Sequence, residues 1–317
     1  MNLTKTTPES EEFLKEWYSD EEYVTAHTSG STGAPKMIKL LKQDMIASAS
    51  ATNRFFNITE SSRLVSPLSA SYIAGKMMIV RTVLAGATLE MLTPSNQLNL
   101  HGRITLLPIV PSQIESLMTY ADSDVKIDNV IVGGAPMTPE MERMLEQFPA
   151  NCYATYGMTE TCSHVAIRKV GTPYFQALPG VKFEVDESSR LMLRLQHFSF
   201  STLQTNDVVE LQSEESFRWL GRYDNVVNSG GVKLFPEEIE REIAPFIKGE
   251  FYLCGMPHAK WGQQLVICIT PHTVVDHAAM EAEVSHIRLP KKTITLDKFE
   301  YTSNGKIKRV VPAGFEE

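Results

Sequence analysis

A glycine- and hydroxyl-rich stretch near the N-terminus has the residue types of a phosphate-binding loop. Nine consecutive residues, Thr28-Ser29-Gly30-Ser31-Thr32-Gly33-Ala34-Pro35-Lys36, contain four hydroxyl side chains, two glycines and a lysine. Glycine lets the backbone turn tightly, and consecutive exposed N–H groups form an anion-binding nest. The Walker spacing is absent, because no Gly-Lys-Ser/Thr follows Gly30 at the required offset. The stretch therefore predicts a phosphate loop of another type, with a Ser/Gly-rich surface turn as the alternative.

Further groups of polar residues and glycines follow in a fixed order. They are Tyr156-Gly157-Met158-Thr159-Glu160, Thr205-Asn206-Asp207, Gly221-Arg222-Tyr223-Asp224, Ser229-Gly230-Gly231, Glu237-Glu238-Ile239-Glu240 and Asn304-Gly305-Lys306. Each motif is weak by itself, but the whole ordered set resembles the adenylate-forming superfamily of acyl- and aryl-CoA ligases, luciferases and peptide-synthetase adenylation domains. The resemblance extends from about Thr25 to Arg309.

The resemblance implies a two-step ligase reaction. A carboxylate attacks the α-phosphorus of ATP, pyrophosphate leaves and an acyl-adenylate forms. A thiol, usually that of coenzyme A, then displaces AMP. Because an anion approaches a polyanion in the first step, the site must supply cations and hydrogen-bond donors where charge develops.

Most of the motifs are assigned to ATP by this resemblance. Thr159 would contact the α-phosphate, and Glu160 would bind Mg²⁺, a hard cation that prefers carboxylate and phosphate oxygens. Tyr156 would stack on adenine, and Asp207 with Arg222 would bind the ribose hydroxyls. The full ATP set is Thr28, Ser29, Gly30, Ser31, Thr32, Gly33, Lys36, Gly134, Ala135, Pro136, Tyr156, Gly157, Asp207 and Arg222.

Each assignment has a structural alternative. Glu160 is an acid at a helix start, Tyr156 is an aromatic at a strand end, and Gly133–Pro136 is a strand-to-helix turn. Asp207 and Arg222 are alternatively a surface salt bridge.

Three motifs are implied to serve catalysis and domain movement. Lys306 would bridge the substrate carboxylate and the α-phosphate, although an exposed turn lysine is the alternative reading. Asp224 matches the family hinge, where a short polar residue absorbs a large change in backbone angles. Gly230 and Gly231 would border the tunnel for coenzyme A, because missing side chains leave room for a narrow chain.

The acyl pocket is expected after Pro67. The stretch from Ser69 to Arg81 resembles o-succinylbenzoate–CoA ligases of menaquinone biosynthesis, especially short forms that lack an N-terminal part. Lys76 is expected to hold a second, unreacted carboxylate, with Ser71, Tyr72 and Gly75 in the same pocket, or else to extend to solvent. Arg81 is interpreted as making a structural ion pair. Another aryl- or acyl-CoA ligase and a degenerate nucleotide-binding protein without catalysis are the alternative functions.

Composition limits the remaining classes. The chain has 317 residues, 43% hydrophobic and 21% charged, which is ordinary for a globular enzyme. Its net charge of −8 argues against nucleic acid and anionic membranes as partners. We find neither an apolar run of membrane-helix length nor a signal-peptide core. Cys152, Cys162, Cys254 and Cys268 lack metal-like spacing and suggest reduced thiols of a cytoplasmic protein.

The pattern of elements predicts an α/β fold in two domains. Strands that alternate with helices up to residue 155 favour a mostly parallel sheet, and residues 180–220 read as a small β subdomain. Residues 1–223 are expected to form the adenylation domain and residues 224–317 a small mobile α+β domain. Only about 27 residues precede the glycine loop, so the family's first subdomain is expected to be almost absent, which favours a homodimer.

Overall fold

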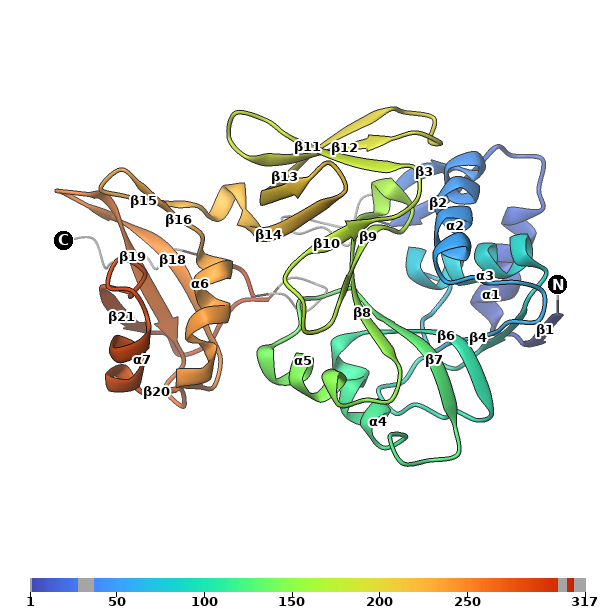
Figure 1. The fold of residues 1–317 in the computed structure, drawn as a ribbon, viewed down its shortest axis with the longest axis horizontal. Coiled ribbons are helices and arrows are strands. Elements are labelled where there is room, and N and C mark those ends of the chain that lie inside the picture. The colour runs from blue at the N-terminus through green and yellow to red at the C-terminus, as the bar shows by residue number, and fades with distance from the viewer. Residues whose placement is uncertain (1, 28–36, 302–306, 311–317) are drawn as a thin grey trace.

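The computed structural model describes residues 2–27, 37–301 and 307–310. It is an α/β structure with one large mixed sheet and a smaller C-terminal sheet (Figure 1). The α-helices are Pro8–Trp17 (α1), Lys42–Phe55 (α2), Ile73–Ala85 (α3), Ile114–Met118 (α4), Pro139–Glu146 (α5), Pro236–Ile243 (α6) and His277–Glu283 (α7). The short 3₁₀ helices are Pro111–Gln113 (η1), Thr159–Thr161 (η2), Tyr223–Asn225 (η3) and Ala244–Phe246 (η4).

The strands fall into four sheets. Those of the large sheet are Asn2–Lys5 (β1), Arg63–Ser66 (β4), Thr88–Met91 (β5), Arg103–Ile109 (β6), Lys126–Val132 (β7), Asn151–Gly157 (β8), His164–Lys169 (β9), Phe175–Ala177 (β10), Val181–Val185 (β11), Arg190–Leu195 (β12), Thr202–Ser213 (β13) and Ser216–Arg222 (β14). The others are Tyr23–His27 (β2), Met37–Leu41 (β3), Val227–Ser229 (β15), Val232–Leu234 (β16), Ile247–Lys248 (β17), Phe251–His258 (β18), Gly262–Ile269 (β19), Val274–Val275 (β20) and Lys292–Thr295 (β21).

The large sheet changes character halfway across. Its order is β1-β5-β4-β6-β7-β8-β9-β10-β14-β13-β12-β11. Pairing is parallel from β1 to β8 and antiparallel from β8 to β11. The expected parallel sheet is therefore confirmed. The region expected as a small β subdomain consists of antiparallel strands, which continue the same sheet.

Helices cover both faces of the parallel half. The helices α2 and α3 pack in one core with Leu106 and Ile131, while residues of α4 and α5 pack in a second core with Ile104 and Val130. The strands of a parallel sheet that is covered on both faces are mostly apolar, and β6 is buried at Ile104 and from Leu106 to Ile109. The motifs at the carboxyl ends of β7 and β8, Gly133–Pro136 and Tyr156–Glu160, lie at the edge of this doubly covered half of the sheet. We call them the strand-end motifs.

Local sequence features set the ends of several elements. Strand β4 spans Arg63–Ser66. The side chain of Thr138 caps α5 by accepting from the N–H of Met141 at 3.2 Å, with Pro139 at the first helical position, and α5 ends at Glu146. Among the described residues, no helix is long and apolar enough to cross a membrane.

The C-terminal sheet has the order β16-β15-β19-β18, and β21 pairs with β19. Helices α6 and α7 pack on it through Ile239, Ile243 and Met280. The last strand of the large sheet, β14, ends at Arg222, and the first strand of the C-terminal sheet, β15, begins at Val227. The division into domains at residues 223 and 224 stays a prediction. Helix α6 contacts β14 across this connection.

Candidate active site

Two of the expected ATP segments stand side by side at one edge of the sheet. Strands β7 and β8 are parallel neighbours, so their carboxyl ends meet at the same edge, where open α/β sheets bind ligands. Gly133–Pro136 follows β7, and Gly157 ends β8 just before η2. A Cβ on Gly133 would lie 2.6 Å from Oγ1 of Thr155, and a Cβ on Gly157 would lie 2.4 Å from the carbonyl oxygen of Ser163. Both positions therefore exclude side chains.

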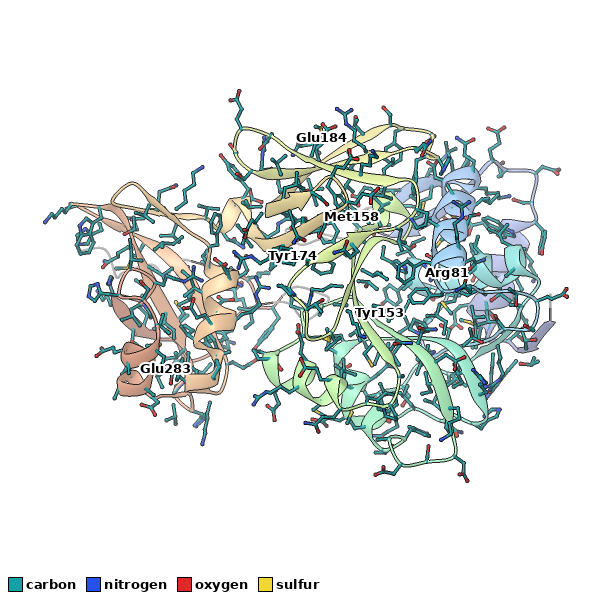
Figure 2. All side chains as sticks on the ribbon, in the orientation of Figure 1. Arg81, Tyr153, Met158, Tyr174, Glu184 and Glu283 are labelled. Carbon is teal, nitrogen blue, oxygen red and sulfur yellow. The ribbon has the colours of Figure 1, made fainter. Side chains whose placement is uncertain are left out.

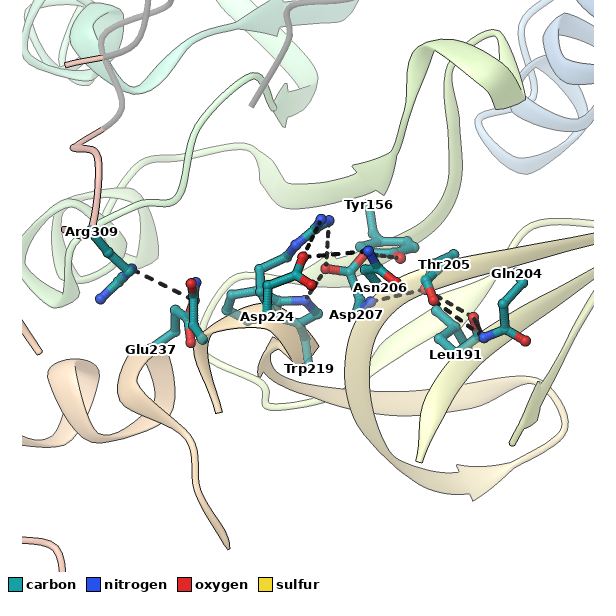
Figure 3. A network of polar contacts seen from close by, with 12 residues as sticks. Tyr156, Leu191, Gln204, Thr205, Asn206, Asp207, Trp219, Asp224, Glu237 and Arg309 are labelled. Carbon is teal, nitrogen blue, oxygen red and sulfur yellow. Dashed lines mark hydrogen bonds and ion pairs between the residues drawn. The ribbon is translucent and has the colours of Figure 1, made fainter. Parts of the chain in front are cut away.

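The Asp207 carboxylate is the centre of a polar network (Figure 3). The hydroxyl of Tyr156 donates to its Oδ2 at 2.7 Å, and Nε1 of Trp219 donates to its Oδ1 at 3.1 Å. Nη1 of Arg222 lies 3.6 Å from the same Oδ1. The side chain of Thr205 accepts from the N–H of Asp207 at 3.1 Å. The structure thus brings together three predicted ATP residues, Tyr156, Asp207 and Arg222.

Tyr156 packs against two other aromatic rings. Its ring meets Phe217 edge-on at 5.2 Å and Phe175 at 5.9 Å. Burial, and then the charge of Asp207, raise the pKa of Tyr156 well above its usual value. The hydroxyl therefore stays protonated and donates to Asp207. Stacking of this ring on adenine stays a prediction.

Thr159 and Glu160 lie on η2 at the end of β8. Glu160 is exposed, and Thr159 is half-buried. No group of three His, Cys, Asp or Glu that could hold a metal occurs among the described residues. A single exposed carboxylate suits a cation whose other ligands are phosphate oxygens and water. Magnesium binding by Glu160 stays a prediction.

The hinge candidate Asp224 lies in η3, between the two sheets. Its Oδ2 lies 3.6 Å from Nη2 of Arg222 and accepts from Nδ2 of Asn206 at 3.4 Å. Further on, Gly230 and Gly231 have φ angles of +57° and +85°. Within the described ranges of the chain, no heavy atom outside its immediate neighbours lies within 4 Å of a Cβ built on Gly231. This open space is compatible with the expected coenzyme A tunnel, which stays a prediction.

Lys76 has a partner within the protein. Its Nζ lies 3.2 Å from Oε2 of Glu16 and donates to the carbonyl oxygen of Thr25 at 2.7 Å. A substrate carboxylate is therefore not needed to compensate this lysine, and its expected role in substrate binding stays untested. Nearby, Ser71 and Tyr72 are exposed, and Tyr72 occupies the position just before the first residue of α3.

Gly75 lies on α3 next to Lys76. A Cβ on Gly75 would lie 2.2 Å from the carbonyl oxygen of Ser69. The chain can therefore pass this close only because the residue is glycine.

Arg81 is the buried cation that the sequence did not assign to the site. It lies on α3 among the helices that cover the sheet (Figure 2). Its Nη2 donates to Oγ of Ser163 at 2.8 Å, and its buried Nε has no partner among the described atoms. The structural ion pair expected for Arg81 is not found within the described part of the chain. Burial lowers the pKa of Arg81 to about 9.

Polar side chains surround Arg81. Oγ of Ser163 lies 2.7 Å from Oγ of Ser48, and Nε2 of His164 lies 3.3 Å from Oγ1 of Thr52. Burial, and then the charge of Arg81, hold the pKa of His164 well below its usual value. A hollow next to this cluster is lined by Ser48, His164, Leu178, Gly180, His197 and Phe198, among others.

Two predicted segments cannot be placed. The phosphate loop from Thr28 to Lys36 lies outside the described residues. The motif that ends at Lys306 lies outside them as well. Tyr301 and Ile307, which flank the second segment, form an isolated β-bridge.

Comparisons with known proteins agree with the fold. The family described as AMP-binding enzyme matches residues 4–188, more than half of the chain. The chain belongs to this family, and more broadly to the AMP-forming acid–CoA ligase superfamily.

Curated relatives carry one recurring name. The 2-succinylbenzoate–CoA ligase of Listeria monocytogenes is 25% identical, over 97% of this chain and 73% of that protein. The 2-succinylbenzoate–CoA ligase of Staphylococcus epidermidis is 23% identical, over 89% of this chain and 67% of that protein.

Solved structures share the fold. An acyl-CoA synthetase (AMP-forming)/AMP-acid ligase II-like protein from Dyadobacter fermentans is 30% identical with a TM-score of 0.63, covering 95% of this chain and 91% of that chain. The O-succinylbenzoate coenzyme A synthetase of Bacillus subtilis, in complex with ATP and magnesium ion, has a TM-score of 0.75 at 19% identity, covering 89% of this chain and 68% of that one. At this identity the second likeness supports the fold alone.

Proposed function

We propose that this chain is an ATP-dependent acid–CoA ligase that converts o-succinylbenzoate to o-succinylbenzoyl-CoA, a step of menaquinone biosynthesis. The names of its curated relatives support this substrate. One structural observation supports the dicarboxylic substrate most strongly. Arg81 is a buried cation without an ion-pair partner in the described part of the chain.

The nucleotide half of the proposal rests on the strand-end motifs. Asp207 and Arg222 would bind the ribose, Gly134, Ala135 and Pro136 would line the adenine, and Glu160 would hold Mg²⁺ at the phosphates. Bound magnesium would neutralise phosphate charge during attack of the acid. Lys306 and the loop from Thr28 to Lys36 would contact the phosphates, and Gly231 would border coenzyme A.

The acid half of the proposal rests on charge. A buried guanidinium without a carboxylate is unfavourable, because burial removes its hydration and only an anion restores the lost interaction. Arg81 is connected to the adjoining hollow by two serines. It donates to Ser163, the hydroxyl of Ser163 lies within hydrogen-bond distance of that of Ser48, and Ser48 lines the hollow. o-Succinylbenzoate carries a second, aromatic carboxylate that must be held without reacting. We assign that carboxylate to Arg81 and its serine neighbours.

The test compares two acids and two proteins. The acids are o-succinylbenzoate and 4-oxo-4-phenylbutyrate, which lacks the ring carboxylate, and the proteins are the wild type and Arg81→Met. Methionine keeps an unbranched apolar side chain at the position. Pyrophosphate release should fall about 100-fold in kcat/KM for o-succinylbenzoate in the variant. The loss should lie mainly in KM, because the held carboxylate is charged in both the ground state and the transition state.

The monocarboxylic acid supplies the control. It should be a poor substrate of the wild type, and Arg81→Met should change its kcat/KM by less than about threefold. Equal losses for both acids would make Arg81 a structural residue. A wild type that prefers benzoate or a fatty acid would contradict the substrate, while AMP-forming chemistry would stand.

A further inference from the structure

Trp219 contacts the nucleotide candidate site although it belongs to no recognised motif. Its indole Nε1 donates to Oδ1 of Asp207 at 3.1 Å, opposite the Tyr156 hydroxyl on Oδ2 (Figure 3). Each carboxylate oxygen can accept two hydrogen bonds, so both oxygens keep capacity for ribose hydroxyls. The two protein donors fix the plane of the carboxylate.

A β-bulge accompanies this contact. Strands β13 and β14 pair Asp207 with Arg222 and Val208 with Gly221, but Val209 pairs with Trp219, so the register skips Leu220. Bulges re-aim side chains, and they are common next to active sites. An indole N–H is a donor only, so it cannot reverse its polarity. Trp219 can therefore only donate to Asp207, and this contact favours the ionised, accepting form of the carboxylate.

The same tryptophan is held from the other side by the C-terminal region. Nη2 of Arg241, on α6, donates to the carbonyl oxygen of Trp219 at 2.8 Å. The guanidinium of Arg241 also lies 5.5 Å from the centroid of the indole. Since α6 follows the hinge candidate Asp224, Trp219 connects the Asp207 carboxylate to the region expected to rotate.

We propose that Trp219 is a positioning residue that orients Asp207 toward the ribose of ATP and makes this orientation depend on Arg241 of α6. The inference rests on the proposed function, because it assumes that Asp207 binds ribose. Without the indole N–H, the Asp207 carboxylate keeps the Tyr156 hydroxyl but loses its other hydrogen-bond donor. Its plane is then no longer fixed relative to the ribose. The loss then falls on ribose recognition and leaves the other contacts of the nucleotide intact.

The experiment uses the full chain with ATP and with 2′,3′-dideoxy-ATP, which lacks both ribose hydroxyls. Pyrophosphate release at saturating acid gives kcat/KM for each nucleotide in the wild type and in Trp219→Phe, which keeps an aromatic ring but has no N–H. We expect Trp219→Phe to lower kcat/KM for ATP about tenfold and to change that for the dideoxy nucleotide by less than about twofold. A general structural defect would lower both equally.

Control variants separate the outcomes. Val209→Ala alters packing at the residue paired with Trp219 without touching a polar atom, and it should leave the ratio of the two nucleotides unchanged. Arg241→Met should lower the ratio in the same direction as Trp219→Phe. An unchanged ratio in Arg241→Met would overturn the link to α6.

Different results would contradict the positioning role of Trp219 and the ribose role of Asp207. If the wild type prefers ATP and Trp219→Phe keeps the full preference, the positioning role is wrong, while Asp207 keeps its ribose role. If the wild type and Asp207→Asn treat both nucleotides alike, Asp207 does not bind ribose. That result overturns the ribose assignment and this inference with it.

Discussion

Lys76 and Glu16 form an ion pair 60 residues apart in the chain, with Nζ of Lys76 3.2 Å from Oε2 of Glu16. The pair joins α3 to α1. Glu16 also accepts from the N–H of Thr25 at 2.7 Å, and these contacts outweigh burial and lower the pKa of Glu16 below its usual value. On the same helix, Arg81 has no such partner among the described residues. The two cations of α3 should therefore respond differently to removal.

Replacing each cation by methionine tests this difference. Lys76→Met leaves Glu16 with one donor fewer, and it should lower the thermal midpoint and slow both acids alike. Arg81→Met removes a buried charge without an ion-pair partner in the described chain, so it should be neutral or stabilising while it selectively weakens o-succinylbenzoate. Thermal unfolding and two-acid kinetics of both variants provide the measurement. Selective loss of the dicarboxylic acid in Lys76→Met would support the lysine as its ligand instead.

Arg309 and Glu240 form a second, half-buried pair. Nη2 of Arg309 donates to Oε2 of Glu240 at 2.7 Å, and Oε1 accepts from the N–H of Leu253 at 2.6 Å. Arg309→Met should destabilise the chain by about 1–3 kcal/mol, because it leaves a half-buried carboxylate without its cation. Adding Glu240→Gln removes that charge and should recover most of the loss. Urea unfolding of the single and double variants measures both effects, and a single variant as stable as the wild type would refute the account.

His164 should make the fold sensitive to mild acid. Its pKa in the folded state lies well below the usual value of 6.5, because burial and Arg81 disfavour the charged form. Below pH 6.5 the unfolded chain binds a proton that the folded chain does not, so stability falls as the pH falls. Between pH 7 and 5 this contribution can reach at most about 2 kcal/mol. In urea unfolding at both pH values, His164→Gln should lack this part of the loss; an identical loss in the variant would contradict the assignment.

Asp224→Pro should separate the two half-reactions. Proline fixes φ near −65°, so a hinge that needs two backbone conformations would stay in one of them. If the fixed φ suits adenylation, the variant should release pyrophosphate but form little thioester, whereas Asp224→Ala should do both. Separate assays of pyrophosphate and of acyl-CoA make the comparison. Normal overall turnover in Asp224→Pro would mean that the chain does not rotate there.

The sequence predicted the parts of the structure that depend on local patterns. Alternating apolar strands and helices located the parallel sheet and its edge. Because β7 and β8 are parallel neighbours, their motifs had to meet. The contact of Tyr156 with Asp207 was not predicted, because it joins β8 to β13 across 51 residues.

The remaining features depend on tertiary packing that a single sequence does not reveal. Glu16 meets Lys76 only because α1 lies on α3, and nothing in the pattern around Glu16 indicates it. Trp219 reaches Asp207 across a bulged strand pair, and bulges leave little sequence signal. The sequence shows Arg81 as a cation on an apolar helix. Only the packing of the neighbouring elements shows that it has no ion-pair partner among the described residues.

The most direct test of the central claim is the identity of the products formed from ATP. ATP, magnesium and o-succinylbenzoate are incubated with the full chain, with and without coenzyme A, and the nucleotides are resolved by chromatography. We expect pyrophosphate that depends on the acid, with acyl-adenylate as the other product when coenzyme A is absent, and with free AMP and o-succinylbenzoyl-CoA formed when coenzyme A is present. Formation of ADP and phosphate, or nucleotide cleavage that ignores the acid, would contradict it.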